Sequence, residues 1–216
     1  MRGKPMPVEI KGAYELNKAL KKFAPDLEKN LNKEVRAFLM PVVKEAKSLA
    51  PSSIPGLSNW TYSQKKYKKI TANTSKFRRG KFPKYNVSEV KAGIVAHINP
   101  AKENNKGFIA LYRIVNASPA GAIYETAGRK HPGGQPWNKK AGSHKYSHSN
   151  NPEAGLHFNN SFPRLAGEGN MRGRLIYKAW ADNQGRALGG VVKSIERTQA
   201  TFKGRLDATS AFKKVA

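Results

Sequence analysis

A sustained apolar stripe along residues 25–50 constrains the fold of this chain more than any other feature of its sequence. Apolar side chains recur every three or four residues, which is the spacing of one face of an α-helix. Pro25 and Asp26 suit the first turn of this helix, and Ala50-Pro51 marks its end. Pro41 interrupts the stripe, but the pattern continues beyond it, so we expect a kink rather than an end. The stripe consists of Leu27, Leu31, Val35, Phe38, Leu39, Val42, Ala46 and Leu49.

Two further helices are predicted, one on each side of this stripe. Residues 12–23 form a short amphipathic segment with apolar residues at helical spacing. A last helix begins after Gly169, and its apolar residues also fall near one face. Each glycine in a helix interior costs about 1 kcal/mol, so we expect a break where three of them gather. These three are Gly185, Gly189 and Gly190.

Strand patterns lie between the helices. An apolar alternation predicts a strand over residues 87–98, and residues 108–115 are rich in β-forming residues. Residues 99–107 connect the two as a hairpin loop, and residues 120–126 are a candidate third strand. These elements predict an α+β fold, in which N-terminal helices and a C-terminal helix pack on a small antiparallel β-sheet with long basic loops.

The length of 216 residues suits one domain with extensions. We therefore expect a single α+β domain over residues 1–216. Its predicted extensions are a basic arm over about 52–86, a long irregular loop over about 128–160 and a frayed C-terminal tail over about 207–216.

The basic arm is the strongest chemical signal in the sequence. The chain has 40 Lys and Arg against 14 Asp and Glu, a formal charge of +26, and no acid lies between Glu45 and Glu89. Such a surface attracts nucleic acid, an acidic protein or anionic lipid. The predicted polyanion or partner contacts are Lys65, Lys66, Lys68, Lys69, Arg78, Arg79 and Lys81. The predicted interface anchors are Trp60 and Tyr62, because aromatic side chains bury much area for little entropy.

Four histidines gather in the polar loop: His131, His144, His148 and His157. Four imidazoles suggest zinc, but no pair has the regular spacing of a structural site, and Glu153 is the only nearby acid. A solvated loop is therefore the favoured interpretation. The chain has no cysteine, which excludes disulfides and thiolate metal sites. We predict neither a metal nor a cofactor.

No set of residues forms a recognisable catalytic pattern. Glu125 follows three apolar residues, and an acid beside buried residues can act as a general base, but Glu125 lacks an evident partner. A structural hydrogen-bond acceptor, or a member of an interface ion pair, is the favoured role for Glu125, and Trp180 is also expected to be structural. Residues 128–134 match neither a P-loop nor a dinucleotide fingerprint, and no serine lies in a nucleophile-elbow pattern. We predict that the chain is not an enzyme.

The sequence gives no indication of a membrane segment. Residues 1–7 have a basic start but no apolar stretch of a signal peptide, and no apolar run approaches the roughly 20 residues that span a bilayer. We expect synthesis in a cytoplasm.

Three segments carry a family resemblance. Residues 40–51 place a proline inside the predicted helix and end it with Ala-Lys-x-x-Ala-Pro. Residues 122–128 hold a tyrosine-glutamate pair and a nearby glycine, and residues 177–183 enter the last helix. In this order, the segments resemble the HK97 gp10-like family of phage neck and tail-completion proteins. The chain departs from that pattern at residues 52–57, in place of Thr-Gly-x-Leu, and at Tyr177-Lys178, in place of Arg-Pro.

The resemblance implies a structural virion protein of a tailed phage. It implies an α+β subunit that forms a ring, a hexamer or a dodecamer, and joins head to tail as a head-tail connector. The implied neighbours are other neck and tail proteins, such as the tail terminator, stopper or tube, and the implied location is the virion neck or tail. The positive charge suits either DNA or acidic neighbouring rings, and the sequence leaves both open.

Two other classes of function compete with this one. The first is a free nucleic-acid-binding protein, associated with ribosomes or chromosomes, although no helix-turn-helix, zinc-finger or RNA-binding motif is present. The second is an enzyme with a histidine-metal loop, which requires stoichiometric metal. The sequence favours the connector.

Overall fold

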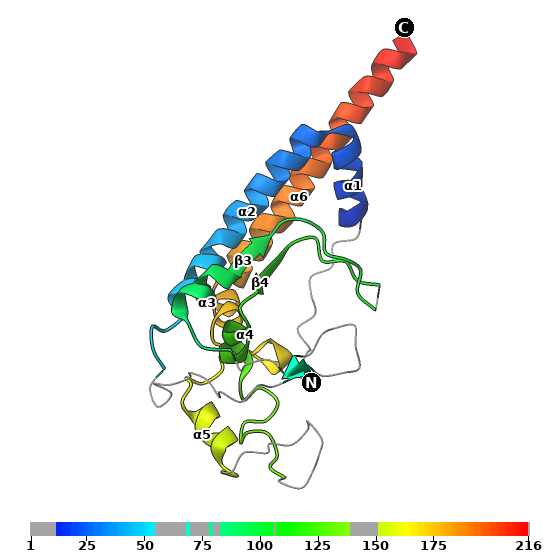
Figure 1. Cartoon of the computed structure of the whole chain (residues 1–216). Helices are drawn as coiled ribbons and strands as arrows, with labels where there is room; N and C mark the ends of the chain where they lie inside the picture. Colours follow the sequence, from blue (N-terminus) through cyan, green and yellow to red (C-terminus); the bar gives the residue numbers. More distant parts are fainter. Residues whose placement is uncertain are drawn as a thin grey trace. The chain divides into compact units, whose positions relative to one another are not determined.

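The computed structural model describes residues 12–54, 68–69, 78–79, 83–105, 107–138 and 151–215 (Figure 1). These residues fall into two compact units. Unit 1 takes its residues from Met1–Glu45, Ala96–Val115 and Ala179–Ala216, and unit 2 takes its residues from Ala46–Val95 and Asn116–Lys178. The fold is mostly helical α+β: the N-terminal helices and a long C-terminal helix pack with a two-stranded antiparallel sheet. The predicted fold class is confirmed, and the single domain over residues 1–216 stays a prediction.

The two N-terminal helices lie where the apolar periodicity predicts them. Helix α1 spans Ala13–Phe23, and Gly12 precedes it with a positive φ of 76°. Ala24 alone separates it from α2, which spans Pro25–Ser48. Helix α2 continues through Pro41, as predicted. It ends just before Ala50, which is buried.

The C-terminal helix is longer and more continuous than the sequence predicts. Helix α6 spans Ile176–Val215, a run of 40 residues, and the expected break at the three glycines does not occur. The apolar residues that flank the glycines, among them Ala187, Val191 and Ile195, are buried or half-buried and hold this part of α6 in unit 1. The backbone remains helical from Asp207 to Val215, where the sequence analysis expects a frayed tail.

The core of unit 1 joins its helices to the sheet. Leu20, Leu31 and Val35 are buried at its centre, and Ile195 of α6 packs into the same cluster. Strand β3 spans Ile94–His97 and pairs with β4, Arg113–Asn116. In the part of this hairpin that belongs to unit 1, the packing residues are Ala96, Ile98, Tyr112 and Ile114. Burial, with the nearby carboxylate of Glu28, raises the pKa of Tyr112 to about 12.

The predicted strand over residues 87–98 is half wrong. Its first half is helix α3, Val87–Gly93, and only the second half forms β3. The Asn86 side chain accepts hydrogen bonds from the backbone N–H groups of Ser88 and Glu89, at 2.9 and 3.3 Å, and this N-cap starts the helix. Val90 and Ile94 are both fully buried. Their spacing of four fits a helical turn as well as it fits a strand, which explains the error.

The second predicted strand is shorter than expected. Of residues 108–115, only the end belongs to β4. The preceding residues form the hairpin connection, in which the N–H of Ala101 donates to the carbonyl of Ala110 at 2.8 Å. Gly107 takes a φ of 76° in the turn, so the predicted hairpin loop is confirmed.

The predicted third strand over residues 120–126 is wrong. These residues belong to helix α4, Pro119–Thr126. The N–H of Gly121 donates to Oγ of Ser118 at 3.2 Å, and a proline at the first position suits a helix start.

Short elements complete the fold. The long loop contains helix α5, Ala154–Asn160, which the sequence analysis does not predict, and a 3₁₀ turn, Gly169–Met171, precedes α6. In the basic arm, strand β1, Lys68–Lys69, pairs with β2, Arg78–Arg79.

Candidate interaction surfaces

The first candidate surface is the two-stranded ribbon of the basic arm. Its antiparallel register places Lys68 opposite Arg79 and Lys69 opposite Arg78. Like charges at opposite positions destabilise a ribbon, and a bound polyanion removes that repulsion. The structure thus brings together four of the seven predicted polyanion contacts. The remaining three, Lys65, Lys66 and Lys81, and both predicted anchors, Trp60 and Tyr62, lie outside the described residues.

Sequence charge is distributed unevenly between the two units. Unit 2 has 20 Lys and Arg against four acids, whereas unit 1 has 20 against ten. The ribbon belongs to unit 2. Any polyanion contact is therefore expected to be strongest on unit 2.

Glu125 and Arg174 form the most extensive buried polar arrangement of unit 2. The Glu125 carboxylate accepts hydrogen bonds from the backbone N–H groups of Leu175, at 2.5 Å, and Tyr177, at 2.9 Å. Because the first N–H groups of a helix have no partner within it, this carboxylate caps the start of α6. The predicted role of Glu125 as a structural hydrogen-bond acceptor is confirmed.

Arg174 caps a helix end in return. Its Nη1 donates to the carbonyls of Tyr124, at 2.8 Å, and Ala127, at 2.9 Å, where α4 ends. Its Nε donates to the carbonyl of Pro163 at 2.6 Å. The guanidinium also lies 4.9 Å from the centre of the Phe162 ring, within the range of a cation–π contact. Arg174 is only 6% exposed, so these acceptors replace its water.

The close approach of Glu125 depends on Gly173. A Cβ at this glycine would lie 2.2 Å from Oε1 of Glu125 and 2.7 Å from Cδ2 of Tyr177. Burial raises the pKa of the Glu125 carboxyl above its ordinary value, although the N–H groups of Tyr177, Leu175 and Ile176 and the charge of Arg129 oppose this shift. Burial likewise lowers the pKa of Arg174.

A chain of contacts links this capping pair to the exit of α2. The Tyr85 hydroxyl donates to the carbonyl of Pro51 at 2.8 Å. The Tyr85 ring lies 5.9 Å from the ring of Tyr124, which packs edge-on against Phe162 at 5.4 Å. Pro51, Tyr124 and Tyr177 belong to the three segments of the family resemblance. A part of each segment therefore lies in unit 2, whereas residues 40–45 and 179–183 belong to unit 1.

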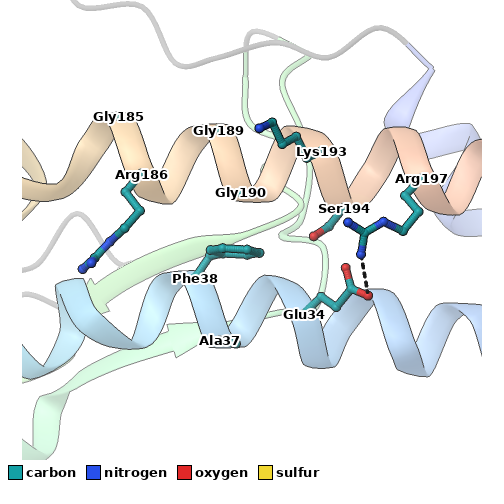
Figure 2. Close-up of a pocket in the computed structure, with 10 residues that line it drawn as sticks. All are labelled: Glu34, Ala37, Phe38, Gly185, Arg186, Gly189, Gly190, Lys193, Ser194 and Arg197. Atoms are coloured by element: carbon teal, nitrogen blue, oxygen red, sulfur yellow. Dashed lines mark ion pairs between the residues drawn. The ribbon is translucent and has the colours of Figure 1, made fainter.

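The second candidate surface is a groove of about 670 Å³ between α2 and α6 in unit 1 (Figure 2). Helix α2 contributes Glu34, Ala37 and Phe38. Helix α6 contributes small residues, Gly185, Gly189, Gly190 and Ser194, and cations, Arg186, Lys193 and Arg197. The Phe38 ring occupies the space beside Gly190, where an added Cβ would lie 2.3 Å from its Cδ1. Phe38 is 36% exposed, which is unusual for a residue of the predicted apolar stripe.

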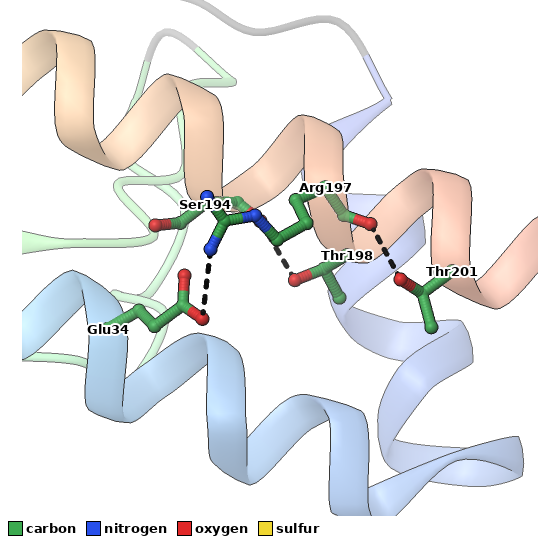
Figure 3. Close-up of polar contacts among 5 residues, drawn as sticks. All are labelled: Glu34, Ser194, Arg197, Thr198 and Thr201. Carbon is green, nitrogen blue, oxygen red and sulfur yellow. Dashed lines mark hydrogen bonds and ion pairs between the residues drawn. The ribbon is translucent and has the colours of Figure 1, made fainter.

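Polar contacts along α6 hold one end of the groove (Figure 3). Nη1 of Arg197 lies 3.7 Å from Oε1 of Glu34. The hydroxyls of Thr198 and Thr201 donate to the carbonyls four residues earlier, those of Ser194 and Arg197. Further along α6, Arg205 pairs with Asp26 at 2.8 Å. The two hydroxyl bonds stay within α6, whereas the two exposed ion pairs connect α6 to α2 within unit 1.

Sequence reasoning misses this groove and the role of Arg174. The glycines of α6 are recognised only as weak points of a helix. Gly185 and Gly189 are four residues apart, and that spacing signals a shared face with no side chains. No sequence signal pairs Gly190 with Phe38, because more than 150 residues separate them.

The described residues include no group of three or more side chains with the arrangement of a metal site. His157 lies 3.6 Å from a carboxylate oxygen of Glu153, and both side chains are largely exposed. His131 is also exposed, and His144 and His148 lie outside the described residues. Within the same part of the chain, no helix has the length and apolar character needed to cross a bilayer.

Comparison with protein-family models, with curated proteins and with solved structures finds no match for this chain. The family resemblance therefore stays an expectation from the three sequence segments.

Proposed function

We propose that this chain is a structural virion protein of a tailed phage, a ring-forming neck or tail-completion component that joins head to tail. It acts by assembly and not by catalysis. Its partners are further copies of itself and adjoining neck or tail proteins. Its basic surface faces DNA or the acidic surface of a neighbouring ring.

The observation that carries this proposal is the convergence of the three resembling segments. They lie far apart in the sequence, and each contributes one residue to the network: Pro51, Tyr124 and Tyr177. The Tyr85 hydroxyl and ring connect the first to the second, and the Glu125 carboxylate connects the second to the third by accepting from the N–H of Tyr177. Residues of separate motifs that build one contact network support a shared structural role better than each motif does alone.

The basic ribbon supports the nature of the contact surface. Four cationic residues at four paired positions suit a surface that meets phosphates or carboxylates without reading a sequence. The same observation supports the alternative, a free nucleic-acid-binding protein associated with ribosomes or chromosomes. The two functions differ in whether DNA binding belongs to the monomer or to the assembled protein.

DNA affinity in separated fractions tests the proposal. Monomer-sized and assembled fractions are collected by gel filtration, and the anisotropy of a labelled DNA duplex is measured against each over a series of salt concentrations. The connector predicts modest, salt-sensitive binding by the assembled fraction. Tight binding by the monomer, with a slope of about −0.9 per phosphate contact summed over many contacts, supports the free binder and contradicts the connector.

A charge-reversed ribbon locates the contact. Lys68, Lys69, Arg78 and Arg79 are changed together to Glu. The matched control changes four exposed lysines of unit 1, Lys18, Lys29, Lys33 and Lys44, to Glu, which alters the net charge equally. The proposal predicts that the ribbon variant loses more affinity and more salt dependence than the control. An equal loss in both variants means that net charge alone, not the ribbon, attracts DNA.

A further inference from the structure

The groove between α2 and α6 is open at two of its lining glycines. A Cβ built on Gly185 or on Gly189 meets no atom within 4 Å, so these positions face empty space in the folded chain. At Gly190, in contrast, the Phe38 ring fills the space that a Cβ would enter. A volume of about 670 Å³ has room for several side chains of a bound segment. The groove is thus open at two glycines and bordered by one aromatic ring (Figure 2).

The charged residues of the groove are mainly cations. Arg186, Lys193 and Arg197 line it, with Glu34 as the one acid among the lining residues. The contact of Arg197 with Glu34 is 3.7 Å long, and the two side chains are 72% and 39% exposed. A pair of this kind contributes about 0–1 kcal/mol, so a carboxylate from a partner can replace it easily. Lys193 makes no ion pair with any residue that the structure describes.

We propose that this groove binds an acidic, amphipathic segment of a partner protein. Apolar side chains of the segment enter above Gly185 and Gly189 and contact the Phe38 ring. Its carboxylates pair with Arg186, Lys193 and Arg197. Binding of an amphipathic segment in a groove combines apolar burial with charged contacts at the margin in this way.

Charge complementarity selects this occupant over a second copy of the chain. The chain carries +26, and unit 1 itself has twice as many basic as acidic residues, so a second copy brings mostly like charge to the groove. A phosphate backbone suits the groove less well, because the lining combines its cations with glycines and the Phe38 ring.

This inference deepens the proposed function, because it names the chemistry of an adjoining neck or tail protein. It rests on that function only for the identity of the partner. Segment binding and ring formation are separate measurements, so either is able to fail while the other succeeds.

Selection of peptides from a random library tests the inference without assuming a partner sequence. The full chain is the bait, and selections are run in parallel on the wild type, on Gly189→Leu and on Gly204→Leu. Gly189→Leu adds a large side chain at a lining position of the groove. Gly204→Leu is the matched control, since Gly204 lies on the same helix, is exposed and has no atom within 4 Å of a built Cβ. Both changes replace a helical glycine with a better helix former, so both variants are expected to fold.

The inference predicts enrichment of acidic peptides with apolar residues at helical spacing, on the wild type and on Gly204→Leu. Affinities of the enriched peptides, measured by anisotropy, are expected to fall at least tenfold on Gly189→Leu. Lys193→Glu is expected to lower them as well. Three results overturn the inference: equal affinity on all variants, enrichment of peptides without acidic residues, or no enrichment at all. A decrease in self-association on Gly189→Leu without acidic enrichment also overturns it, and assigns the groove to a second copy.

Discussion

Glu125 and Arg174 each cap the helix beside the other. Glu125 lies on α4 and accepts from the N–H groups of Leu175 and Tyr177, which start α6. Arg174 lies two residues before the first residue of α6 and donates to the carbonyls of Tyr124 and Ala127, where α4 ends. Both side chains are buried, at 4% and 6% exposure. The end of one helix and the start of the next are thus held by reciprocal charged hydrogen bonds.

Glu125→Gln is expected to destabilise unit 2. The amide retains one acceptor oxygen but turns a donor toward one of the two backbone N–H groups. A buried donor left without an acceptor costs about 1–3 kcal/mol. Denaturant unfolding monitored by circular dichroism measures the change. A stability within error of the wild type would show that the Glu125 carboxylate does not cap α6.

The cost of Glu125→Gln is also expected to depend on pH. The pKa of the Glu125 carboxyl is raised in the folded chain, chiefly by burial. The folded state therefore holds the proton more tightly than the unfolded state, and the contribution of Glu125 is largest below its ordinary pKa. That contribution decreases as pH rises through the folded pKa, whereas glutamine does not titrate. The stability difference between wild type and variant should shrink as pH rises. A difference that grows with pH would mean that the folded pKa is lowered.

Gly173→Ala is expected to disturb the same cap without changing its charge. The added methyl group would meet Oε1 of Glu125 and the Tyr177 ring at distances that no real contact allows. Overpacking of this kind costs about 1–3 kcal/mol. Gly185→Ala is the matched control, because its Cβ enters open space and alanine favours a helix by up to about 1 kcal/mol. The midpoint temperatures of thermal unfolding should shift in opposite directions, down for Gly173→Ala and up for Gly185→Ala. A higher midpoint in both variants would contradict the close approach at Gly173.

Neighbouring glycines of α6 are expected to respond differently to alanine. Gly189→Ala should stabilise unit 1, whereas Gly190→Ala meets the Phe38 ring and should be about 1–3 kcal/mol less stable than Gly189→Ala. Combining Gly190→Ala with Phe38→Ala should restore part of the loss, with a coupling energy of about 0.5–3 kcal/mol. Additive effects in this double-mutant cycle would show that the two residues do not touch.

Long apolar periodicity predicts α1, α2 and most of α6, because each of these helices buries one face. Shorter segments are less determined by their sequence. Val90 and Ile94 fit both a strand and a helix, and the N-cap of Asn86 decides for α3. Residues 120–126 lack any clear period, and the capping hydroxyl of Ser118 sets their helical start.

The candidate surfaces follow the same pattern. Charge composition identifies the basic arm, and four of its predicted contacts fall on the β1–β2 ribbon. Its apolar neighbours and the lack of an evident partner in the sequence identify Glu125 as structural. The backbone group that it caps lies 50 residues away and has no sequence signal of its own. The groove depends on Phe38 and Gly190, which only the tertiary fold brings together.

The mass of the purified chain tests the proposed connector most directly. Light scattering and negative-stain microscopy are carried out at about 0.15 M and 1 M salt, a range over which exposed charges become strongly screened. The account predicts closed rings of a defined mass that persist at 1 M salt or form on addition of neck or tail partners. A chain that remains a monomer at both salt concentrations, forms no ring with any neck partner and binds DNA tightly until salt releases it would contradict the connector.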